Sequence, residues 1–402
     1  MSGALRYARD FLLTELKRLR HGWVEPTWDP EASFEKAPLF LDSLELVELA
    51  GLLADRFHLR DAGLEELLLA YRSLEGWARI LEQARQTVTK VSFLTSGTTG
   101  TPKKTTHRWS WLTKEAEFFA SQLFALQIFD TSLGQSRLIK AVPSHHIYGL
   151  IWTWLVSEAA SAEVLELDLG APRWQAGDVV VTTPFLLHLW LTRGLPVAGT
   201  KFILSSAPFP DEDAELLTAQ GATFLEVFGS SETAGIGWRT QPGEGFRLLP
   251  WWSWKNDQLS RTEQGQGQGQ GSFELQEHFE LPDHVAFVSP DTLRPNGRKD
   301  FVVSIGGVNV NPNKVQQALL RCPLVAKATV RLGSHGRLKA FIVPTGQAGP
   351  DLETQLRAWA SQNLSSPERP ASYSWGSELP VSALGKPCDW TERTERAQGN
   401  LR

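Results

Sequence analysis

The residues with the clearest chemical purpose form a short run of glycines and hydroxylated side chains that ends in lysines. The run TSGTTGTPKK occupies residues 95 to 104 and begins in the strand-like stretch VSFLTS. Small residues let backbone amides turn inward around phosphate oxygens, hydroxyls add donors, and Lys103 or Lys104 supplies positive charge. The Walker pattern needs glycine, four residues and then Gly-Lys-Ser/Thr, which this run lacks. We therefore predict a nucleotide-phosphate loop of another kind, rather than a plain surface loop, built from Thr95, Ser96, Gly97, Thr98, Thr99, Gly100 and Lys103.

A second candidate lies at the start of a helix near the amino terminus. In LDSLELVELAGLLADRF, residues 41 to 57, Asp42 and Ser43 precede an apolar stripe at helical spacing. Asp and Ser satisfy the free amides of a first helical turn, so Ser43 can be a simple helix-start residue in a small all-α lobe. The pattern also resembles an acyl carrier protein over about residues 1 to 85. That resemblance implies that Ser43 carries phosphopantetheine, attached by a phosphopantetheinyl transferase.

Three further sequence motifs follow the phosphate loop in the order found in one known superfamily. They are PSHHIYGL (143 to 150), SSAP (205 to 208) and FGSSET (228 to 233). With the loop, they resemble the adenylate-forming superfamily of acyl-CoA synthetases, aryl acid ligases, luciferases and peptide-synthetase adenylation domains. The resemblance implies that His146 and Tyr148 border an acyl pocket, and that Ser231 and Glu232 serve ATP and magnesium.

The carboxy-terminal part continues the same resemblance, over the chain to about residue 390. In SPD (289 to 291), Asp291 stands at the position that holds the ribose hydroxyls, although a proline replaces the family's glycine. GRKDFVVSIGGVNVNP (297 to 312) places a nucleotide-binding arginine at Arg298 and the hinge aspartate at Asp300. ALGKP (383 to 387) places the adenylation lysine at Lys386.

The resemblance implies an AMP-forming ligase that uses ATP and Mg²⁺. A carboxylate is a poor electrophile, and its attack on the α-phosphate of ATP gives a mixed anhydride and expels pyrophosphate. Such a step depends on positioning anions and neutralising charge. Lys386, Glu232 and His146 are then the candidate catalytic residues, with Glu232 as the magnesium ligand. A thiol takes the acyl group in a second step, after the carboxy-terminal domain rotates at the hinge.

The elements that must position these residues follow from periodicity. Helical spacing predicts helices over residues 4 to 20, from Asp42-Ser43 onward, and around Leu74, Trp77 and Leu81. The carboxy-terminal lobe is predicted to hold helices over 312 to 321 and 352 to 363, with strands around 326 to 332 and 338 to 343. The run GQGQGQGS, residues 265 to 272, is predicted to be a loop without chemistry.

These elements predict a multidomain chain. Residues 1 to 86 form a small all-α, four-helix, carrier-like domain, residues 87 to 299 an α/β adenylation core, and residues 300 to 402 a small mobile α/β domain. The length of 402 residues fits two or three domains. The phosphate loop begins only a few residues after the carrier-like segment, so we expect this chain to lack much of the large lobe that usually precedes the loop in this superfamily.

Composition excludes several other classes of protein. The chain is 42% apolar and 21% charged, and its net charge of −5 comes with no basic block, which argues against a nucleic-acid partner. The two cysteines, Cys322 and Cys388, stand in no metal, redox or disulfide pattern. No secretory signal or membrane span is predicted, so we expect a cytoplasmic protein.

Three functions remain as hypotheses. The preferred one is an acyl- or aryl-acid:carrier-protein ligase whose chain carries the acceptor thiol on Ser43 and which hands the acyl group to a ketosynthase or similar assembly enzyme. The second is an acyl-CoA or aryl-CoA ligase that uses free CoA. The third is a non-catalytic scaffold that presents the carrier on a degenerate ligase lobe.

Overall fold

The computed structural model describes residues 1–20, 22–95, 103–126, 128, 136–255, 258–266, 272–281, 283–299, 302–333, 336–346, 349, 351–380 and 389–390. The chain forms two compact units. The first holds Met1–Thr95, Pro102–Glu280 and Phe287–Arg294, and the second is formed chiefly by Pro295–Arg402. Within the described ranges, no helix is long and apolar enough to cross a membrane.

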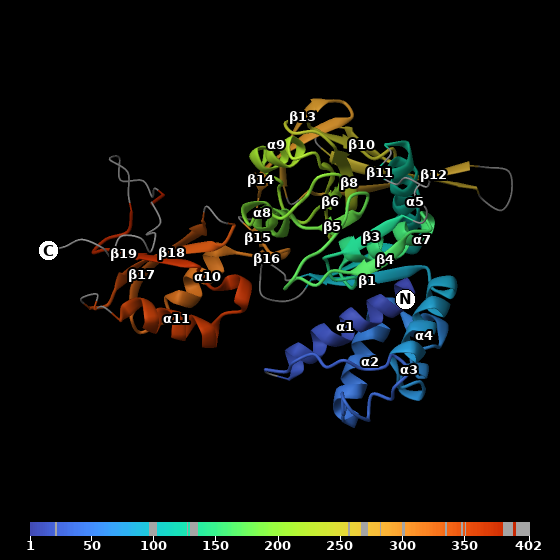
Figure 1. The fold of residues 1–402 in the computed structure, drawn as a ribbon, viewed down its shortest axis with the longest axis horizontal. Helices are drawn as coiled ribbons and strands as arrows, with labels where there is room; N and C mark the ends of the chain where they lie inside the picture. Colours follow the sequence, from blue (N-terminus) through green and yellow to red (C-terminus); the bar gives the residue numbers. More distant parts are fainter. Residues whose placement is uncertain are drawn as a thin grey trace. The chain divides into compact units, whose positions relative to one another are not determined.

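The first unit opens with a group of helices, drawn in blue in Figure 1. They are α1 (Gly3–Leu19), α2 (Ser43–Phe57), a 3₁₀ turn (Leu59–Ala62), α3 (Leu67–Ala70) and α4 (Leu74–Thr87). The predicted start of α2 is confirmed as a capping box: the Asp42 carboxylate accepts from the amides of Leu44 and Glu45, and Glu45 accepts from the amide of Asp42. Ser43 is the first residue of the helix and is exposed.

These helices share an aromatic core with the rest of the first unit. Tyr7 of α1 lies 4.9 Å from Phe57 of α2 between ring centroids, and Phe57 lies 6.3 Å from Trp154. Trp154 in turn lies 6.0 Å from Trp109, which begins α5. All four side chains are buried. Because buried aromatic rings contribute strongly to packing, α1 and α2 are held to the core of the first unit instead of standing apart from it. A separate four-helix carrier domain is therefore not confirmed, and the predicted boundaries at residues 86 and 299 stay predictions.

Most of a nine-stranded sheet lies in the first unit and forms its centre. Its strand order is β13-β14-β9-β8-β7-β6-β5-β3-β4. The strands are β3 (Arg137–Lys140), β4 (Glu163–Glu166), β5 (Val179–Thr182), β6 (Lys201–Leu204), β7 (Thr223–Ser230), β8 (Ala234–Arg239), β9 (Phe246–Leu248), β13 (Asp283–Ser289) and β14 (Thr292–Arg298). Strands β4, β3, β5, β6 and β7 run parallel, and β8 and β9 continue the sheet antiparallel. The inner parallel strands β3, β5, β6 and β7 hold buried valine, leucine, isoleucine and phenylalanine, as expected where both faces are covered, whereas the edge strand β4 is partly exposed.

The remaining helices of the first unit flank this sheet. They are α5 (Trp109–Ala125), α6 (Ile147–Leu150), a π-helical segment (Ile151–Val156), α7 (Ser157–Ala159), α8 (Pro184–Thr192) and α9 (Asp211–Ala219). Trp190 of α8 and Leu217 of α9 share a core with Phe202 and Phe224 of the central strands. This packing fixes the strands whose ends carry the candidate site.

Two smaller sheets complete the first unit. Strands β1 (Lys90–Thr95) and β2 (Lys103–Arg108) form an antiparallel hairpin, and β10 (Trp252–Lys255), β11 (Gln258–Gln266) and β12 (Ser272–Phe279) form an antiparallel sheet. The predicted loop over 265 to 272 is thus too long. Gly265 pairs with Phe273 and Gln266 with Ser272, because backbone pairing between two adjacent strands needs no apolar side chain.

The second unit is an α/β lobe with its own core. Its elements are β15 (Val303–Ile305), β16 (Val308–Val310), α10 (Pro312–Leu319), β17 (Val325–Leu332), β18 (Leu338–Pro344), α11 (Leu352–Asn363), a 3₁₀ turn (Ser366–Glu368) and β19 (Ser372–Trp375). The strand order is β17-β18-β19, and β18 and β19 run parallel. Leu319, Leu338 and Leu356 are fully buried at the centre of its core. The predicted helices and strands of this lobe are confirmed.

Candidate active site

The carboxyl ends of the parallel strands carry three of the predicted site residues, His146, Ser231 and Glu232. Strands β3, β5, β6 and β7 run parallel and adjacent, so the segments that follow them emerge at the same edge of the sheet. These segments carry His146, Ser205-Ser206, and the turn with Ser231 and Glu232. In open α/β sheets this edge is the usual place for ligands.

The segment after β3 is tied across the neighbouring strand ends by Tyr148. The Tyr148 hydroxyl donates to the carbonyl of Ile203 at 2.9 Å and lies 3.1 Å from that of Thr182. Burial raises the pKa of Tyr148, so the phenol stays protonated and able to donate. His146 is exposed, whereas His145 beside it is buried and its pKa is held well below the ordinary value by burial. Of the two rings, the exposed one can meet a ligand directly.

The turn that carries Glu232 is tightly held by its own residues. The amide of Ser230 donates to Thr233 Oγ1 at 3.1 Å, and the amide of Glu232 donates to Ser230 Oγ at 3.2 Å. Gly229 is required by close approach, because a Cβ there would lie 2.1 Å from the carbonyl oxygen of Ala234. The glycine and hydroxyl residues of the FGSSET motif therefore determine the shape of the turn, and they place Glu232 just after the end of β7.

His107 holds the same turn from β2. Its Nε2–H donates to the carbonyl of Ser231 at 2.7 Å, and its side chain is buried. Burial lowers the pKa of His107 to about 4, so the ring is neutral at neutral pH. The proton must then be on Nε2 for this hydrogen bond to form.

Glu115 and Trp252 hold the far end of the turn through Gly235. The buried Glu115 carboxylate lies 3.0 and 3.2 Å from the Gly235 amide, while the indole of Trp252 donates to the Gly235 carbonyl at 2.7 Å. Burial raises the pKa of Glu115 to about 7. A side chain at Gly235 would meet Glu115 Oε1 at 2.5 Å, which explains the glycine.

A cavity of about 570 Å³ opens beside Glu232. Its lining residues are Lys90, Thr106, His107, Arg108, Glu232, Arg261, Glu277, His278 and Phe279. Nη2 of Arg261 lies 2.6 Å from Oε2 of Glu277 in an ion pair. The guanidinium carbon of Arg261 lies 4.5 Å from the ring centroid of Trp111 and 4.8 Å from that of Phe279. Basic side chains and two carboxylates around one cavity suit a phosphate-bearing ligand with its metal ion.

The phosphate run is the connection of the β1–β2 hairpin. Thr95 ends β1 opposite Lys103, which begins β2. Ser96, Gly97, Thr98, Thr99 and Gly100 lie outside the described residues. Lys104 donates to the carbonyl of Asp55 in α2 at 3.3 Å.

The other predicted nucleotide residues are less closely defined. Asp291 lies in the turn between β13 and β14 and is exposed. Its carboxylate accepts from Ser289 Oγ at 2.5 Å and Thr292 Oγ1 at 3.1 Å, which lowers its pKa. Arg298 ends β14, while Asp300 and Lys386 lie outside the described residues.

Comparison with known proteins gives the family. No family model matches the chain. It is 36% identical over 383 residues to a 4-coumarate-CoA ligase of Rhodobacter capsulatus, covering 90% of this chain and 94% of that protein. It is 34% identical to a 4-coumarate-CoA ligase of Halorhodospira halophila, covering 89% and 90%. The chain belongs to the adenylate-forming acid ligases.

Solved structures agree on the fold of this ligase. An o-succinylbenzoate CoA synthetase from Bacillus subtilis matches with a TM-score of 0.51 at 19% identity, covering 74% of this chain and 67% of that one. A malonyl-CoA ligase matches with a TM-score of 0.52 at 19% identity, covering 72% and 71%. At this identity the likeness shows the fold alone.

The relatives also bear on the amino-terminal helices of the ligase. The similarity to the Rhodobacter capsulatus protein covers 90% of the chain, more than residues 87–402 alone contain. Part of the segment interpreted as a carrier therefore belongs to the region shared with proteins named CoA ligases. This agrees with the aromatic core that α1 and α2 share with α5.

Sequence reasoning missed His107, Glu115 and Arg261. Glu115 could have been noticed in the sequence, because it falls on the apolar face of its helix with Leu112, Ala116 and Phe119, where a carboxylate is unexpected. His107 and Arg261 gave no such signal, since a histidine or an arginine in a strand is more often a surface residue.

Proposed function

We propose that this ligase activates an aryl carboxylic acid with ATP and transfers the acyl group to CoA. The observation that carries the proposal is the similarity over 90% of the chain to proteins named 4-coumarate-CoA ligase. The preferred acceptor thus changes from a carrier protein to free CoA, and the acid is a 4-coumarate-like aryl acid.

The Glu232 turn supports the first step. Mg²⁺ is bound in proteins by one or two carboxylates together with substrate phosphates and water, and Glu232 lines a cavity that also holds basic side chains. Glu232 therefore fits the role of magnesium ligand, and the bound ion would neutralise charge on the phosphates. Ser231, on the same turn, is assigned to the nucleotide.

The chemistry of activation needs little from the protein beyond positioning and charge. The acid's carboxylate oxygen bonds to the α-phosphorus, and the bond to the β-phosphate oxygen breaks to release pyrophosphate. We assign Lys386 to the α-phosphate, the loop of Thr95 to Lys103 to the outer phosphates, and Asp291 and Arg298 to the ribose side. The CoA thiol then attacks the acyl carbon and AMP leaves, after motion at the Asp300 hinge.

A carrier thiol on the chain itself is the second candidate. Ser43 is exposed at the start of α2, and the neighbouring apolar side chains Leu44 and Val47 are 82% and 56% exposed, which suits a surface read by a phosphopantetheinyl transferase. Such a transferase and a downstream ketosynthase would be partners only under this candidate. The aromatic core shared by Tyr7, Phe57 and Trp109 favours CoA, because it holds the helices of the supposed carrier in place.

One experiment separates these functions. Purified protein is given ATP, Mg²⁺ and one acid at a time, with 4-coumarate, benzoate and a medium-chain fatty acid as the panel, and pyrophosphate release is measured. We expect release with 4-coumarate and a CoA thioester by mass spectrometry, at equal rates in wild type and Ser43→Ala. Absence of release with every acid would overturn the ligase proposal. Acyl transfer that requires Ser43 and a phosphopantetheine arm would establish the carrier candidate instead.

A further inference from the structure

We infer that the amino-terminal helix α1 is a clamp on the acid-binding segment, with Arg6 and Asp10 as positioning residues. The segment runs from Ser144 to Thr153 and includes His146 and Tyr148. The inference rests on the proposed function, because that function makes this segment the border of the acid pocket.

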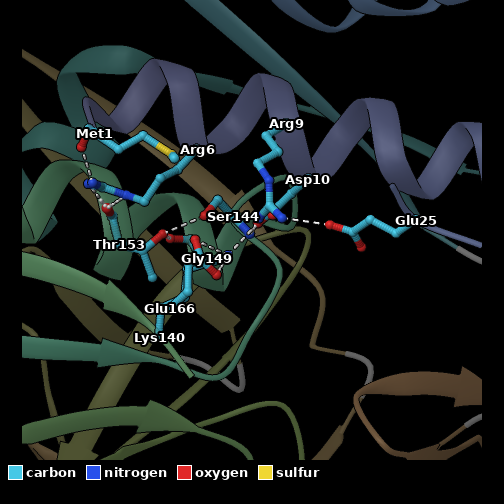
Figure 2. A network of polar contacts seen from close by, with 10 residues as sticks. All are labelled: Met1, Arg6, Arg9, Asp10, Glu25, Lys140, Ser144, Gly149, Thr153 and Glu166. Atoms are coloured by element: carbon cyan, nitrogen blue, oxygen red, sulfur yellow. Dashed lines mark hydrogen bonds and ion pairs between the residues drawn. The ribbon is translucent and has the colours of Figure 1, made fainter. Parts of the chain in front are cut away.

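Asp10 holds the beginning of the segment. Its Oδ2 accepts from the backbone amide of Ser144 at 2.7 Å and pairs with Nζ of Lys140 at 2.9 Å. Lys140 ends β3 and is 5% exposed, and its ammonium also pairs with Glu166 at 2.7 Å. Figure 2 shows Asp10 reaching from α1 toward Ser144. One carboxylate thus joins α1 to the end of β3 and to the residue immediately before the two histidines.

Arg6 holds the end of the segment. Its guanidinium donates to the carbonyl of Thr153 from Nε at 3.2 Å and from Nη2 at 2.6 Å. It also lies 3.4 Å from Ser157 Oγ and donates to the carbonyl of Met1. Thr153 belongs to the π-helical segment, and its carbonyl also accepts from Ser157 Oγ at 3.1 Å. The planar guanidinium of an arginine can direct two donors at one such carbonyl oxygen.

The spacing on α1 matches the two ends of the segment. Residues four apart on a helix lie on the same face, so Arg6 and Asp10 project together. They reach positions 144 and 153, and these two residues are themselves bonded through their hydroxyl groups at 2.8 Å. Gly149, between them, has no room for a side chain, because a Cβ would lie 1.9 Å from the carbonyl of Pro143. The segment from Ser144 to Thr153 is therefore compact, its two ends lie close together, and both ends bind to the same helix, α1.

Burial makes these contacts stronger than surface ion pairs. Arg6 and Asp10 are 5% and 9% exposed. In such surroundings charge-assisted hydrogen bonds are weakly screened, and loss of one partner leaves buried groups unsatisfied. The pair of Arg9 with Glu25 on the same helix is about one-third exposed and provides a matched control.

The test compares four variants of the full chain. Asp10→Ala removes the acceptor of the Ser144 amide, while Lys140 keeps Glu166 as its partner. Asp10→Asn keeps an acceptor for the amide and serves as the conservative rescue. Arg6→Lys replaces the two-donor fork, and Arg9→Gln removes the exposed ion pair. For each variant we measure KM for 4-coumarate, KM for ATP, and amide hydrogen exchange of residues 144–153.

We expect Asp10→Ala to raise KM for the acid about tenfold or more, as for the loss of one charge-assisted hydrogen bond, with less than about a twofold change in KM for ATP. Amide exchange of residues 144–153 should rise in Asp10→Ala, and Asp10→Asn should restore most of the wild-type KM and exchange. Arg6→Lys should raise KM for the acid more than KM for ATP, and Arg9→Gln should match wild type.

If Asp10→Ala does not fold, the KM values and exchange of Arg6→Lys and Asp10→Asn test the clamp. Unchanged exchange, or equal rises in both KM values, would overturn the clamp. A wild type inactive with every acid would instead refute the proposed function, and exchange alone would then decide on the clamp.

Discussion

The Nε2 atom of His107 lies 2.7 Å from the carbonyl oxygen of Ser231, the residue before Glu232. His107 stands on β2, the strand that leaves the phosphate run, and Ser231 stands in the turn after β7. One hydrogen bond therefore couples the two segments assigned to the phosphates and to magnesium. Its donor is a neutral ring, because burial lowers the pKa of His107 to about 4.

Loss of this bond should impair activation more than folding. In His107→Ala the Ser231 carbonyl loses its donor and the Glu232 turn can shift. A shift of about 1 Å at a reacting group can cost on the order of a hundredfold in rate. We expect kcat for pyrophosphate release to fall about tenfold to a hundredfold, with partial recovery in His107→Gln, which offers an amide donor. Equal kcat in wild type and His107→Ala would show that the bond does not position Glu232.

His107 and Glu115 should affect stability with opposite pH dependence. The pKa of His107 is about 4 in the folded state against 6.5 ordinarily, so the unfolded chain binds a proton at this residue at a higher pH than the folded protein does. The contribution of His107 to the free energy of unfolding is therefore lost as pH falls below 6.5. The pKa of Glu115 is about 7 in the folded state against 4.5 ordinarily, so the folded protein keeps this proton to a higher pH than the unfolded chain does. The contribution of Glu115 to the free energy of unfolding is therefore lost as pH rises toward 7. Between pH 4.5 and 6.5 the two slopes, each about 1.4 kcal/mol per pH unit, offset one another.

Urea unfolding across that pH range checks the signs. Relative to wild type, the free energy of unfolding of His107→Gln should decrease as pH rises, because only the Glu115 slope remains. The free energy of unfolding of Glu115→Gln should increase as pH rises, because only the His107 slope remains. Parallel pH profiles for wild type and both variants would contradict the assignment of these buried groups.

The Glu232 turn should not tolerate a side chain at Gly229. A Cβ there would lie 2.1 Å from the Ala234 carbonyl oxygen, and neither backbone can yield without moving the turn. We expect Gly229→Ala to lower the free energy of unfolding by about 1–3 kcal/mol and to abolish most pyrophosphate release. Gly51→Ala is the matched control, because nothing lies within 4 Å of its Cβ and it stands inside α2. That control should gain about 0.5–1 kcal/mol in thermal or urea unfolding. A stable, active Gly229→Ala protein would refute the steric argument.

Glu232 itself should matter for turnover and not for folding. Glu232→Gln keeps the size of the side chain and removes the charge proposed to hold Mg²⁺. We expect pyrophosphate release to fall about tenfold or more at low Mg²⁺ and to recover partly as Mg²⁺ is raised, with an unchanged melting temperature. A Mg²⁺ dependence identical to that of wild type would argue for a purely structural carboxylate.

Much of the local structure could be predicted from sequence because its causes are local. The helix beginning at Ser43 follows from Asp42 and Glu45, which cap it within three residues. The helix over Leu352–Asn363 follows from apolar spacing alone. The site motifs were found by their resemblance to a known superfamily, and the turn that carries Glu232 is held by contacts within a few positions, such as that of the Ser230 amide with Thr233.

The interpretation of residues 1 to 85 as a carrier failed to anticipate contacts that are distant in sequence. Helical spacing says that α1 buries one face, and it says nothing about what covers that face. Asp10 meets a residue 134 positions away, and Arg6 one 147 positions away. The same amphipathic pattern serves a free-standing four-helix lobe and a helix packed on a ligase core, so only the fold distinguishes them.

The last prediction separates the two half-reactions through Lys386. The lysine is assigned to adenylation, the step in which the carboxylate attacks the α-phosphorus and pyrophosphate leaves, so it should be dispensable once the acyl-adenylate exists. We expect Lys386→Ala to lose acid-dependent pyrophosphate release by orders of magnitude, while it still converts a supplied 4-coumaroyl-adenylate and CoA into the thioester at a rate near that of wild type. Lys339→Ala does not suit as a control, because Lys339 is buried and pairs with Asp389 at 3.0 Å. Lys327→Ala, an exposed change on β17 of the same lobe, should retain both half-reactions. If Lys386→Ala loses both half-reactions equally while keeping its melting temperature, the lysine serves the fold of the closed site or the binding of AMP, and its assignment to the α-phosphate is wrong.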